Sequence, residues 1–458
     1  MGLAWCFDCI WIEALFKEII LMAYDIIIGR DEEDKNKFGK EGTVFLGKTY
    51  VQMGRVTSLA NNVYLDVARN HVILICGKRS SGKSYSMGVM CESVLDFPDE
   101  IKNNMSLIIF DTMGIFWTMK YPNQKDEALL EEWGLQAKGF DIDLFVPKGY
   151  FQDYKDKGIP ADYEFALQPK LLNAVDWCGV FGVEMNSDDS VLIARTLKRL
   201  SGDYSIKDIL DEIEDDNKSE QKIKDRVQGL FIAANTWGLF DEDAVDLSKI
   251  ADRGRVNIID LSAYGQVSGN WNIKSLVAGI VCNKLLAERI LYRKKEEVES
   301  IEKGYSIFKE EEYKSELPLL WIFLDEAHQF LSKEKTTPAT ESLISLLREG
   351  RQPGISLVLA TQQPAKVHDD VLTQADIILC HRVTAKQDVD ALNSMMQSYM
   401  EKGLTEAINE LPKEQGAGVI LDDVSERIYP LKVRPKLSWH GGEAPSAIKK
   451  KKSLELGF

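Results

Sequence analysis

The residues best suited to chemistry in this chain form a glycine-rich run, Gly77-Lys78-Arg79-Ser80-Ser81-Gly82-Lys83-Ser84. This run fits the phosphate-loop pattern of Gly, four residues, Gly, Lys, and then Ser or Thr. Glycines let the backbone turn sharply and approach a phosphate closely, and successive N–H groups then bind the anion. Lys83 is the expected ligand of the β- and γ-phosphates, and Ser84 the expected ligand of Mg²⁺. The pattern predicts a site for a nucleoside triphosphate with Mg²⁺.

The sequence around this loop supports the same interpretation. His71 to Cys76 is an apolar run that predicts a buried strand, and Tyr85 to Leu95 predicts a helix. A strand, a glycine loop and a helix in this order place the anion at a helix N-terminus, where the backbone offers partial positive charge. The residues predicted to bind the nucleotide are Gly77, Lys78, Arg79, Ser80, Ser81, Gly82, Lys83, Ser84 and Tyr85.

Two carboxylates follow a second apolar run. Leu319 to Leu324 predicts a strand that ends in Asp325 and Glu326. An acidic residue at the end of such a strand is the second Mg²⁺ contact of many NTPases, a role we assign to Asp325. A carboxylate at Glu326 can orient and polarise the water that attacks the γ-phosphate. This pair favours a hydrolase over a small-molecule kinase, which must exclude water.

Two further catalytic candidates lie after the acidic strand. Ser356 to Ala360 predicts another strand, and Gln362 at its end could sense the γ-phosphate and position the water. Arg351 lies on a short loop before that strand, where a guanidinium could stabilise charge on the transferring phosphoryl group, in trans if the loop faces a neighbouring subunit. The alternative is a surface turn with solvated arginines. The predicted catalytic residues are Lys83, Glu326, Gln362 and Arg351.

Apolar runs and helical spacing alternate along the chain, which predicts an α/β fold with a mainly parallel sheet and helices on both faces. Further strands are expected at residues 107–111, 256–261 and 377–380, with 417–421 and 428–433 as edge strands or a closing hairpin. Residues 43–67 predict a few small strands. A long helix is expected at 273–293, followed by a charged connection over 294–316.

We divide the chain into six segments: an N-terminal extension (1–22), a small β-rich module (23–66), a first core part (67–149), a helical insertion (150–254), a second core part (255–425), and a C-terminal brace with a basic tail (426–458). The extension is either an upstream addition before Met22 or an amphipathic helix that docks on a partner. Within the insertion, Arg195, Lys198 and Arg199 share one predicted helix, and a solvated face is favoured over a DNA contact.

Composition limits the functional classes. The 458 residues carry a net charge of −16, which argues against a uniformly basic nucleic-acid coat protein but leaves room for a locally basic channel. The seven cysteines form no disulfide framework, and Cys6 and Cys9 lack the second pair of a zinc site, so a reducing, cytoplasmic location is expected. Because no uncharged apolar run approaches about 18 residues, no membrane association is expected.

Together, five segments resemble the HerA family of hexameric ATPases, within the HerA–FtsK superfamily: GKRSSGKS (77–84), FDTMG (110–114), LDEAHQFL (324–331), LREGRQPG (347–354) and LATQQP (359–364). The resemblance spans roughly residues 43–440. It implies a RecA-like core in a homohexameric ring that pumps double-stranded DNA, often beside the nuclease NurA. It also implies ATP and Mg²⁺ at Lys83, Ser84 and Asp325, water activation by Glu326, phosphate sensing by Gln362, and a trans-acting Arg351.

The chain departs from the family pattern in two places. Its N-terminal β module is smaller than the usual one, and Gly114 is followed by Ile115 where an acidic residue is frequent. Residues 428–440 resemble the strand and tail that brace one subunit against the next. An ATP-driven DNA translocase or helicase is the leading expectation. A regulatory or defence-associated NTPase that controls an effector, and a conjugation-type transfer motor, remain as alternatives.

Overall fold

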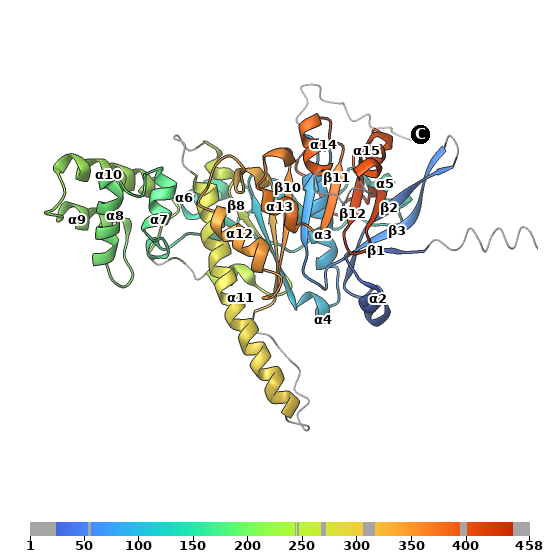
Figure 1. Cartoon of the computed structure of the whole chain (residues 1–458), viewed down its shortest axis with the longest axis horizontal. Coiled ribbons are helices and arrows are strands. Elements are labelled where there is room, and N and C mark those ends of the chain that lie inside the picture. Colours follow the sequence, from blue (N-terminus) through green and yellow to red (C-terminus); the bar gives the residue numbers. More distant parts are fainter. Residues whose placement is uncertain are drawn as a thin grey trace, which may run out of the picture.

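A computed structural model of the chain describes residues 24–442, apart from 54–55, 243, 245–246, 267–271, 306–316 and 394–400. The predicted extension at 1–22, with Cys6 and Cys9, and the basic tail at 449–452 lie outside the described residues. The described strands form one 13-stranded sheet in the order β1-β3-β2-β13-β12-β11-β4-β10-β9-β5-β8-β6-β7. Helices cover both faces, and a group of helices extends beyond one end (Figure 1).

The centre of the sheet is parallel and buried. Its neighbouring strands are β11 (Ile377–His381), β4 (Val72–Cys76), β10 (Ile355–Thr361), β9 (Leu319–Leu324), β5 (Met105–Asp111) and β8 (Val256–Asp260). Parallel strands covered on both faces consist of nearly continuous apolar residues, which is why these strands were predictable from the sequence. Their carboxyl ends lie at the same edge of the sheet, and the phosphate loop, Asp325 and Gln362 follow directly from that edge.

The N-terminal strands differ from the expected small module. β2 (Thr43–Met53) and β3 (Val56–Asp66) form an antiparallel hairpin of two 11-residue strands, flanked by β1 (Ile26–Ile28). β12 (Ala417–Asp422) and β13 (Arg427–Val433) form the predicted closing hairpin, but they lie inside the sheet instead of at its edge. Because β13 also pairs with β2, the N-terminal hairpin continues the main sheet.

At the other end, two unpredicted strands extend the sheet beyond β8. These are β6 (Asp143–Pro147) and β7 (Tyr163–Phe165), joined through α6 (Lys148–Asp156). The first part of the predicted insertion therefore contributes to the sheet. The helices expected in the insertion follow as α7 (Ala174–Phe181), α8 (Asp188–Arg199), α9 (Ile206–Glu214) and α10 (Gln221–Asn235).

Two basic residues of α8 have ion-pair partners inside the insertion. Arg195 pairs with Asp216 at 2.8 Å, and Arg199 pairs with Glu212 at 3.0 Å. Asp216 is buried, so the two arginines join α8 to α9 and to the segment that follows it. Arg195 and Arg199 therefore have structural partners within their own chain.

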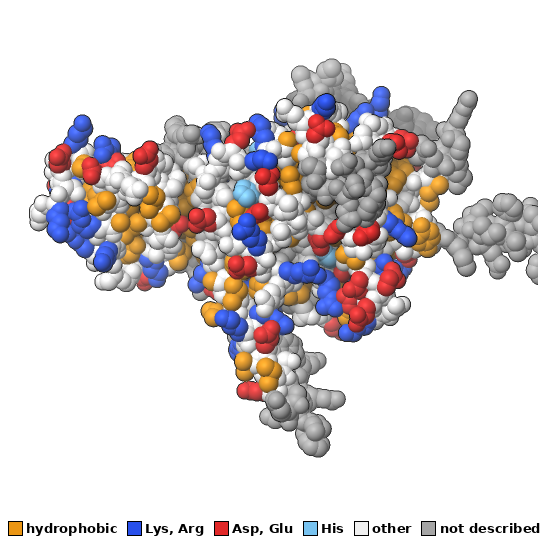
Figure 2. Space-filling model, in the orientation of Figure 1, with side chains coloured by type: hydrophobic (Ala, Val, Ile, Leu, Met, Phe, Trp, Pro, Cys, Tyr) orange, Lys and Arg blue, Asp and Glu red, His pale blue; other side chains and the backbone are white. Residues whose placement is uncertain are grey.

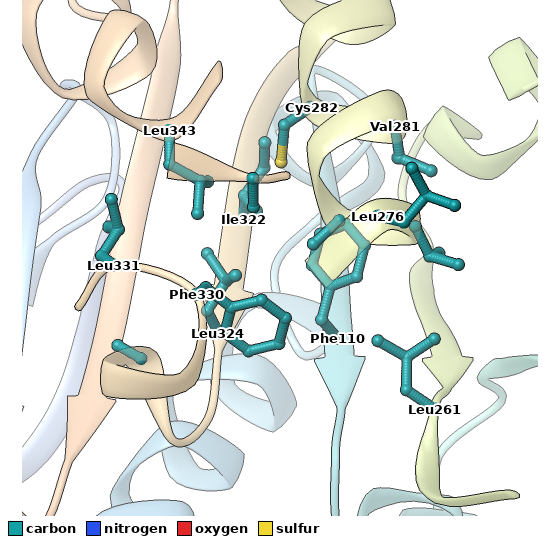
Figure 3. Packing of buried hydrophobic residues seen from close by; sticks show 14 of the residues in the cluster. Phe110, Leu261, Leu276, Val281, Cys282, Ile322, Leu324, Phe330, Leu331 and Leu343 are labelled. Atoms are coloured by element: carbon teal, nitrogen blue, oxygen red, sulfur yellow. The ribbon is translucent and has the colours of Figure 1, made fainter. Parts of the chain in front are cut away.

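Alternate residues of the central strands face two separate cores. In β5, Ile108 and Phe110 pack with α11 (Ile273–Tyr305) and α12 (Thr340–Glu349), while Leu107 and Ile109 pack with α3 (Lys83–Leu95). Figure 3 shows the first core, where Phe110, Leu276, Ile322 and Leu343 meet between the sheet and these two helices. Cys76, Cys91, Cys178, Cys282 and Cys380 are all buried and free, as small core residues would be.

Helix α11 is longer than predicted. It continues through residues 294–305, which were expected to form a charged connection, and it projects away from the body (Figure 1). Ion pairs between Lys284 and Glu288 (3.1 Å) and between Arg293 and Glu296 (3.2 Å) join successive turns, as charges spaced by three or four residues do on helices. No described helix is both long enough and apolar enough to cross a bilayer.

The remaining helices are short. α2 (Glu32–Phe38), α4 (Asp99–Lys102) and α5 (Glu127–Glu132) belong to the first half of the chain. α13 (Asp369–Gln374), α14 (Lys386–Asn393) and α15 (Glu401–Glu410) follow β10 and β11. Single 3₁₀ turns, η1 to η6, occupy Phe116–Lys120, Pro169–Leu171, Leu247–Ala251, Ser262–Gln266, Ala327–Gln329 and Pro364–Lys366.

Candidate functional site

The phosphate loop connects the end of β4 to the first turn of α3. Gly82 has a φ of 115°, a conformation that side chains other than glycine rarely adopt. A Cβ atom at Gly77 would come within 2.3 Å of the Ser81 hydroxyl oxygen, so the first glycine is required by space. Ser80 also has a positive φ, of 60°. The two glycines therefore allow the tight turn that places Lys83 and Ser84 at the start of α3.

The predicted metal ligands meet although 241 residues separate them. Ser84 Oγ donates a hydrogen bond to Asp325 Oδ2 at 2.6 Å, and Asp325 Oδ1 accepts one from the Glu326 N–H at 2.8 Å. Burial raises the pKa of Asp325, and the Ser84 hydroxyl opposes this. A hydroxyl and a carboxylate are hard oxygen donors of the kind that Mg²⁺ prefers, so the donor set fits that ion.

Lys83 lies beside this pair. Its side chain is buried, and Nζ donates to the Lys78 carbonyl oxygen at 3.3 Å. Burial lowers the pKa of Lys83, while the nearby Glu326 and Asp325 carboxylates raise it. A buried ammonium group next to two carboxylates can exchange its carbonyl contact for a phosphate, which carries more negative charge.

The two strand ends expected to supply catalysis lie next to each other, because β9 and β10 are adjacent and parallel. Gln362 Nε2 donates a hydrogen bond to Glu326 Oε1. Glu326 has a left-handed backbone (φ 54°), which a residue other than glycine adopts only when its surroundings hold it there. The fold thus brings Lys83, Ser84, Asp325, Glu326 and Gln362 into one place.

Arg351 is the predicted site residue that the fold does not bring there. It precedes β10, and its carbonyl oxygen accepts a hydrogen bond from Asn70 Nδ2 at 2.9 Å, just before β4 begins. Arg351 therefore lies at the opposite edge of the sheet from the phosphate loop of its own chain. The seven residues of β10 separate the two edges by about 20 Å, which is more than an arginine side chain can reach.

A pocket of about 590 Å³ opens beside the loop, between Ser80 and Tyr85 on one side and the last described residues on the other. Tyr85 and His440 form one wall, with their rings edge to face at 5.2 Å between centroids. Trp439 also lines the pocket. Of the residues that line the pocket, Ser80, Gly82 and Tyr85 were predicted, whereas no local motif marks the C-terminal wall.

The segment that forms this wall, residues 434–442, is here called the C-terminal strap. It is fastened to α3 through Glu92, which is fully buried. Glu92 Oε1 accepts hydrogen bonds from Arg434 Nη1 (2.7 Å) and the Leu437 N–H (2.8 Å), and Oε2 accepts them from the N–H (3.1 Å) and hydroxyl (2.7 Å) of Ser438. Most of the strap lies within residues 428–440, for which the sequence predicts an intersubunit brace, and it packs here on the phosphate-loop helix of its own chain.

Asp111 organises the turn after β5 and does not face the nucleotide ligands as a free carboxylate. Its two oxygens accept hydrogen bonds from four successive backbone N–H groups, at residues 113–116 and distances of 2.7–3.1 Å. Burial and the neighbouring Asp260 carboxylate raise the pKa of Asp111, while these donors lower it. Ile115, which departs from the family pattern, takes part through its backbone alone.

Comparisons with known proteins agree with these observations. The profile of the family described as "Helicase HerA, central domain" matches residues 51–288, more than half of the chain, and that of Zonular occludens toxin matches residues 280–386. The chain is 26% identical to the probable DNA double-strand break repair helicase HerA of Methanocaldococcus jannaschii over 184 residues, covering 38% of this chain and 33% of that protein.

A longer match is with the DNA double-strand break repair helicase HerA of Saccharolobus solfataricus, 22% identical over 349 residues, which covers 75% of this chain and 59% of that one. The chain thus spans less than two thirds of the length of these relatives. Among solved structures, VirB4 of Thermoanaerobacter pseudethanolicus is similar with a TM-score of 0.51 and 11% identity, covering 86% of this chain and 96% of that one, which shows a shared fold. By its family match and its phosphate-loop fold, the chain belongs to the HerA family of P-loop ATPases.

Proposed function

We propose that the chain is a ring-forming ATPase that couples ATP hydrolysis to the translocation or unwinding of double-stranded DNA. The observation that carries the ATPase assignment is the convergence of Ser84, Asp325, Glu326 and Gln362 beside Lys83. These residues supply a phosphate ligand, two metal-binding oxygens, a base and an amide, which are the parts that phosphoryl transfer to water requires.

In this mechanism the triphosphate lies along the loop, with Lys83 against its β- and γ-phosphates. Ser84 and Asp325 would hold Mg²⁺, which would neutralise charge that develops on the phosphate oxygens. Glu326 accepts the proton of the attacking water, and Gln362 lies where it can contact both that water and the γ-phosphate. Base and sugar occupy the 590 Å³ pocket, whose aromatic wall includes Tyr85 and His440.

The position of Arg351 supports a ring. Its own phosphate loop is at the far edge of the sheet, so Arg351 can contribute to hydrolysis only at a neighbouring subunit. Among the described residues, the Arg351 guanidinium has no ion pair, whereas Arg348 pairs with Asp370 at 2.7 Å. A head-to-tail interface that closes into a ring would place each free Arg351 beside the next nucleotide. The resemblance to the family favours six subunits.

DNA as the substrate is proposed from the relatives, whose names describe double-strand break repair helicases. The overall charge of −16 requires any DNA-binding charge to be local. Figure 2 shows Lys and Arg interspersed with Asp and Glu over the described part of the visible face. We therefore place the DNA contact on surfaces that a ring would turn toward its centre.

A nuclease of the NurA type, or another effector, is the proposed partner. One observation also favours the second candidate function, an NTPase that controls an effector without moving DNA. The N-terminal strands β1 to β3 join the main sheet through β13 and do not form a separate barrel of the kind the family uses for docking. The partner-binding face of this chain would then differ from that of its relatives.

The deciding experiment measures ATP hydrolysis with and without duplex DNA. Glu326→Gln should lower kcat by about 10²–10⁴-fold, because the general base is lost while its volume is kept. The matched control is Glu33→Gln, an exposed residue of α2. We expect duplex DNA to stimulate the parent and not Glu326→Gln. A hydrolysis rate that does not change when DNA is added would contradict the proposed translocase function and favour an NTPase that controls an effector.

A further inference from the structure

The Glu326 carboxylate is held at one oxygen more firmly than at the other. Oε1 accepts a hydrogen bond from Gln362, as described above. Oε2 is buried and lacks a hydrogen bond of normal length from any described residue. Its polar neighbour is His328 Nδ1, at 3.5 Å. A buried carboxylate oxygen without a full partner is unusual, and at a catalytic site it invites a functional explanation.

His328 reaches this position because of the backbone of Glu326. The left-handed conformation of Glu326 turns the chain directly into the 3₁₀ turn η5, which carries His328 back toward the ends of β9 and β10. There, Nδ1 also lies 3.3 Å from the hydroxyl oxygen of Thr361, the last residue of β10. Thr361 is fully buried and its Oγ1 accepts a hydrogen bond from the Gln363 N–H at 3.1 Å.

We propose that His328 is a positioning residue for water activation: its Nδ1–H, shared between Glu326 Oε2 and the Thr361 hydroxyl oxygen, orients the Glu326 carboxylate toward the attacking water, and the Thr361 oxygen as acceptor fixes the plane of the imidazole. This proposal rests on the proposed ATPase function and adds two residues to it. Glu326 would then be held from two strand ends, by Gln362 after β10 and by His328 after β9, so that one lone pair of the carboxylate keeps a fixed direction.

The chemistry of the pair favours this arrangement. If Nδ1 carried no proton, its lone pair would face the negatively charged Oε2, so the Nδ1–H tautomer is the favourable one. Burial lowers the pKa of His328, and the Glu326 charge opposes that effect. A neutral ring orients the carboxylate without neutralising it, whereas an imidazolium would make Glu326 a weaker base. The 3.5 Å separation exceeds a full hydrogen bond, and catalytic hydrogen bonds commonly shorten in the reacting complex.

The test compares three substitutions at one position. His328→Asn places an amide N–H where Nδ1 lies, His328→Gln extends the amide to the position of Nε2, and His328→Ala removes the donor. We expect His328→Ala and His328→Gln to lower kcat by about 10- to 100-fold, the usual cost of losing an orienting contact, with KM for ATP and the affinity for a fluorescent ATP analogue unchanged. His328→Asn should recover most of the lost kcat.

Two substitutions of Thr361 provide an independent test of the same proposal. Thr361→Ser keeps the hydroxyl and should retain activity, while Thr361→Val keeps the shape and should lower kcat in the same direction as His328→Ala. Thermal melting monitors folding in every variant. If the His328 variants do not fold, the Thr361 pair decides the question, since neither of its members changes the volume of the buried site greatly.

The outcomes separate this proposal from the function on which it rests. Wild-type kcat in His328→Ala, alongside an inactive Glu326→Gln, would overturn the role of His328 and leave the ATPase standing. An inactive His328→Asn that binds ATP normally would also overturn it, because the restored N–H would then be irrelevant. A wild-type protein without ATPase activity would instead remove the proposed function itself.

Discussion

His71 is a buried residue whose protonation stabilises the fold. It lies just before β4, with Nδ1 2.7 Å from Asp376 Oδ2 and Nε2 3.7 Å from Asp66 Oδ2. Burial by itself would lower the pKa of His71, but the two carboxylates raise it to about 9. Asp66 also pairs with the buried Arg30 at 2.6 Å. This charge network joins the N-terminal hairpin to the amino ends of β4 and β11.

The network predicts a stability that depends on pH. Because the pKa of His71 is higher in the folded protein than the usual 6.5, its contribution is fully present below pH 6.5 and is lost as the pH rises through about 9. The free energy of unfolding, measured by urea denaturation, should therefore fall as the pH rises from 6.5 to about 9. His71→Asn should flatten that slope. An equal slope in the parent and the variant would show that other groups control it.

The individual residues of the motifs were predictable because their types and their spacing along the chain indicate which chemical role each has. Lys83 and Ser84 belong to a pattern with a known physical basis, and Asp325 and Glu326 follow an apolar run at the expected place. The positions of His328, Thr361 and the pocket-lining His440 were not predictable as site features. Each depends on contacts between segments distant in sequence, or on the left-handed backbone of Glu326, which the residue type does not predict.

Elements were predicted best where the hydrophobic pattern alone decides them. β9 has its predicted bounds, and β4, β5, β8, β10 and β11 lie within about two residues of theirs. β6 was missed because its five residues follow a polar loop and contain Asp143 and Pro147. α11 was ended too early because residues 294–305 are too charged to show an apolar stripe, although ion pairs between turns support the helix there.

The junction between α3 and the C-terminal strap depends on one buried side chain, that of Glu92. Glu92→Ala would leave the buried Arg434 guanidinium without its carboxylate and remove the acceptor of two backbone N–H groups. We expect a loss of about 3–5 kcal/mol in the free energy of unfolding, as for other broken buried ion pairs. Urea denaturation measures it.

Glu100→Ala, at an exposed position of α4, is the control for that substitution and should change the unfolding free energy by less than about 0.5 kcal/mol. Glu92→Gln should fall between the two, because an amide keeps one acceptor oxygen. Equal midpoints for Glu92→Ala and Glu100→Ala would mean that the strap contributes nothing to the stability of α3.

For the whole molecule, the separation of Arg351 from its own phosphate loop gives a test by subunit mixing. Arg351→Ala and Glu326→Gln should each lose most hydrolysis when alone. Mixed in equal amounts and allowed to reassemble, they should regain activity at about one quarter of the sites, where an intact Glu326 meets an intact Arg351 from the neighbour. Steady-state ATPase assays of the mixtures provide the measurement.

Arg348→Ala is the control, because Arg348 already pairs with Asp370 in its own chain. It should keep most of the hydrolysis. Full ATPase activity of Arg351→Ala alone would show that Arg351 is a solvated surface residue with no role in hydrolysis. Two inactive variants that fail to complement each other would argue against a site shared between subunits.

The overall architecture was predictable as a parallel α/β sheet, but its extent was not. Hydrophobic periodicity predicts that a segment is a strand but does not predict which strand it pairs with. Nothing in residues 43–66 therefore indicated that β2 would pair with β13, nearly 400 residues away. That pairing depends on long-range packing across the whole chain. It also makes the expected N-terminal module part of the central sheet.

The order of strands also affects how the protein can be made. Chains fold from the N-terminus as they leave the ribosome, and the hairpin of β2 and β3 emerges before β4. Its strand partner β13 emerges last among the described strands, followed by the strap that closes the nucleotide pocket. A nascent chain would therefore carry a phosphate loop long before it has a complete site. Because the strap lines the nucleotide pocket, that pocket would be complete only after the strap has also been synthesised.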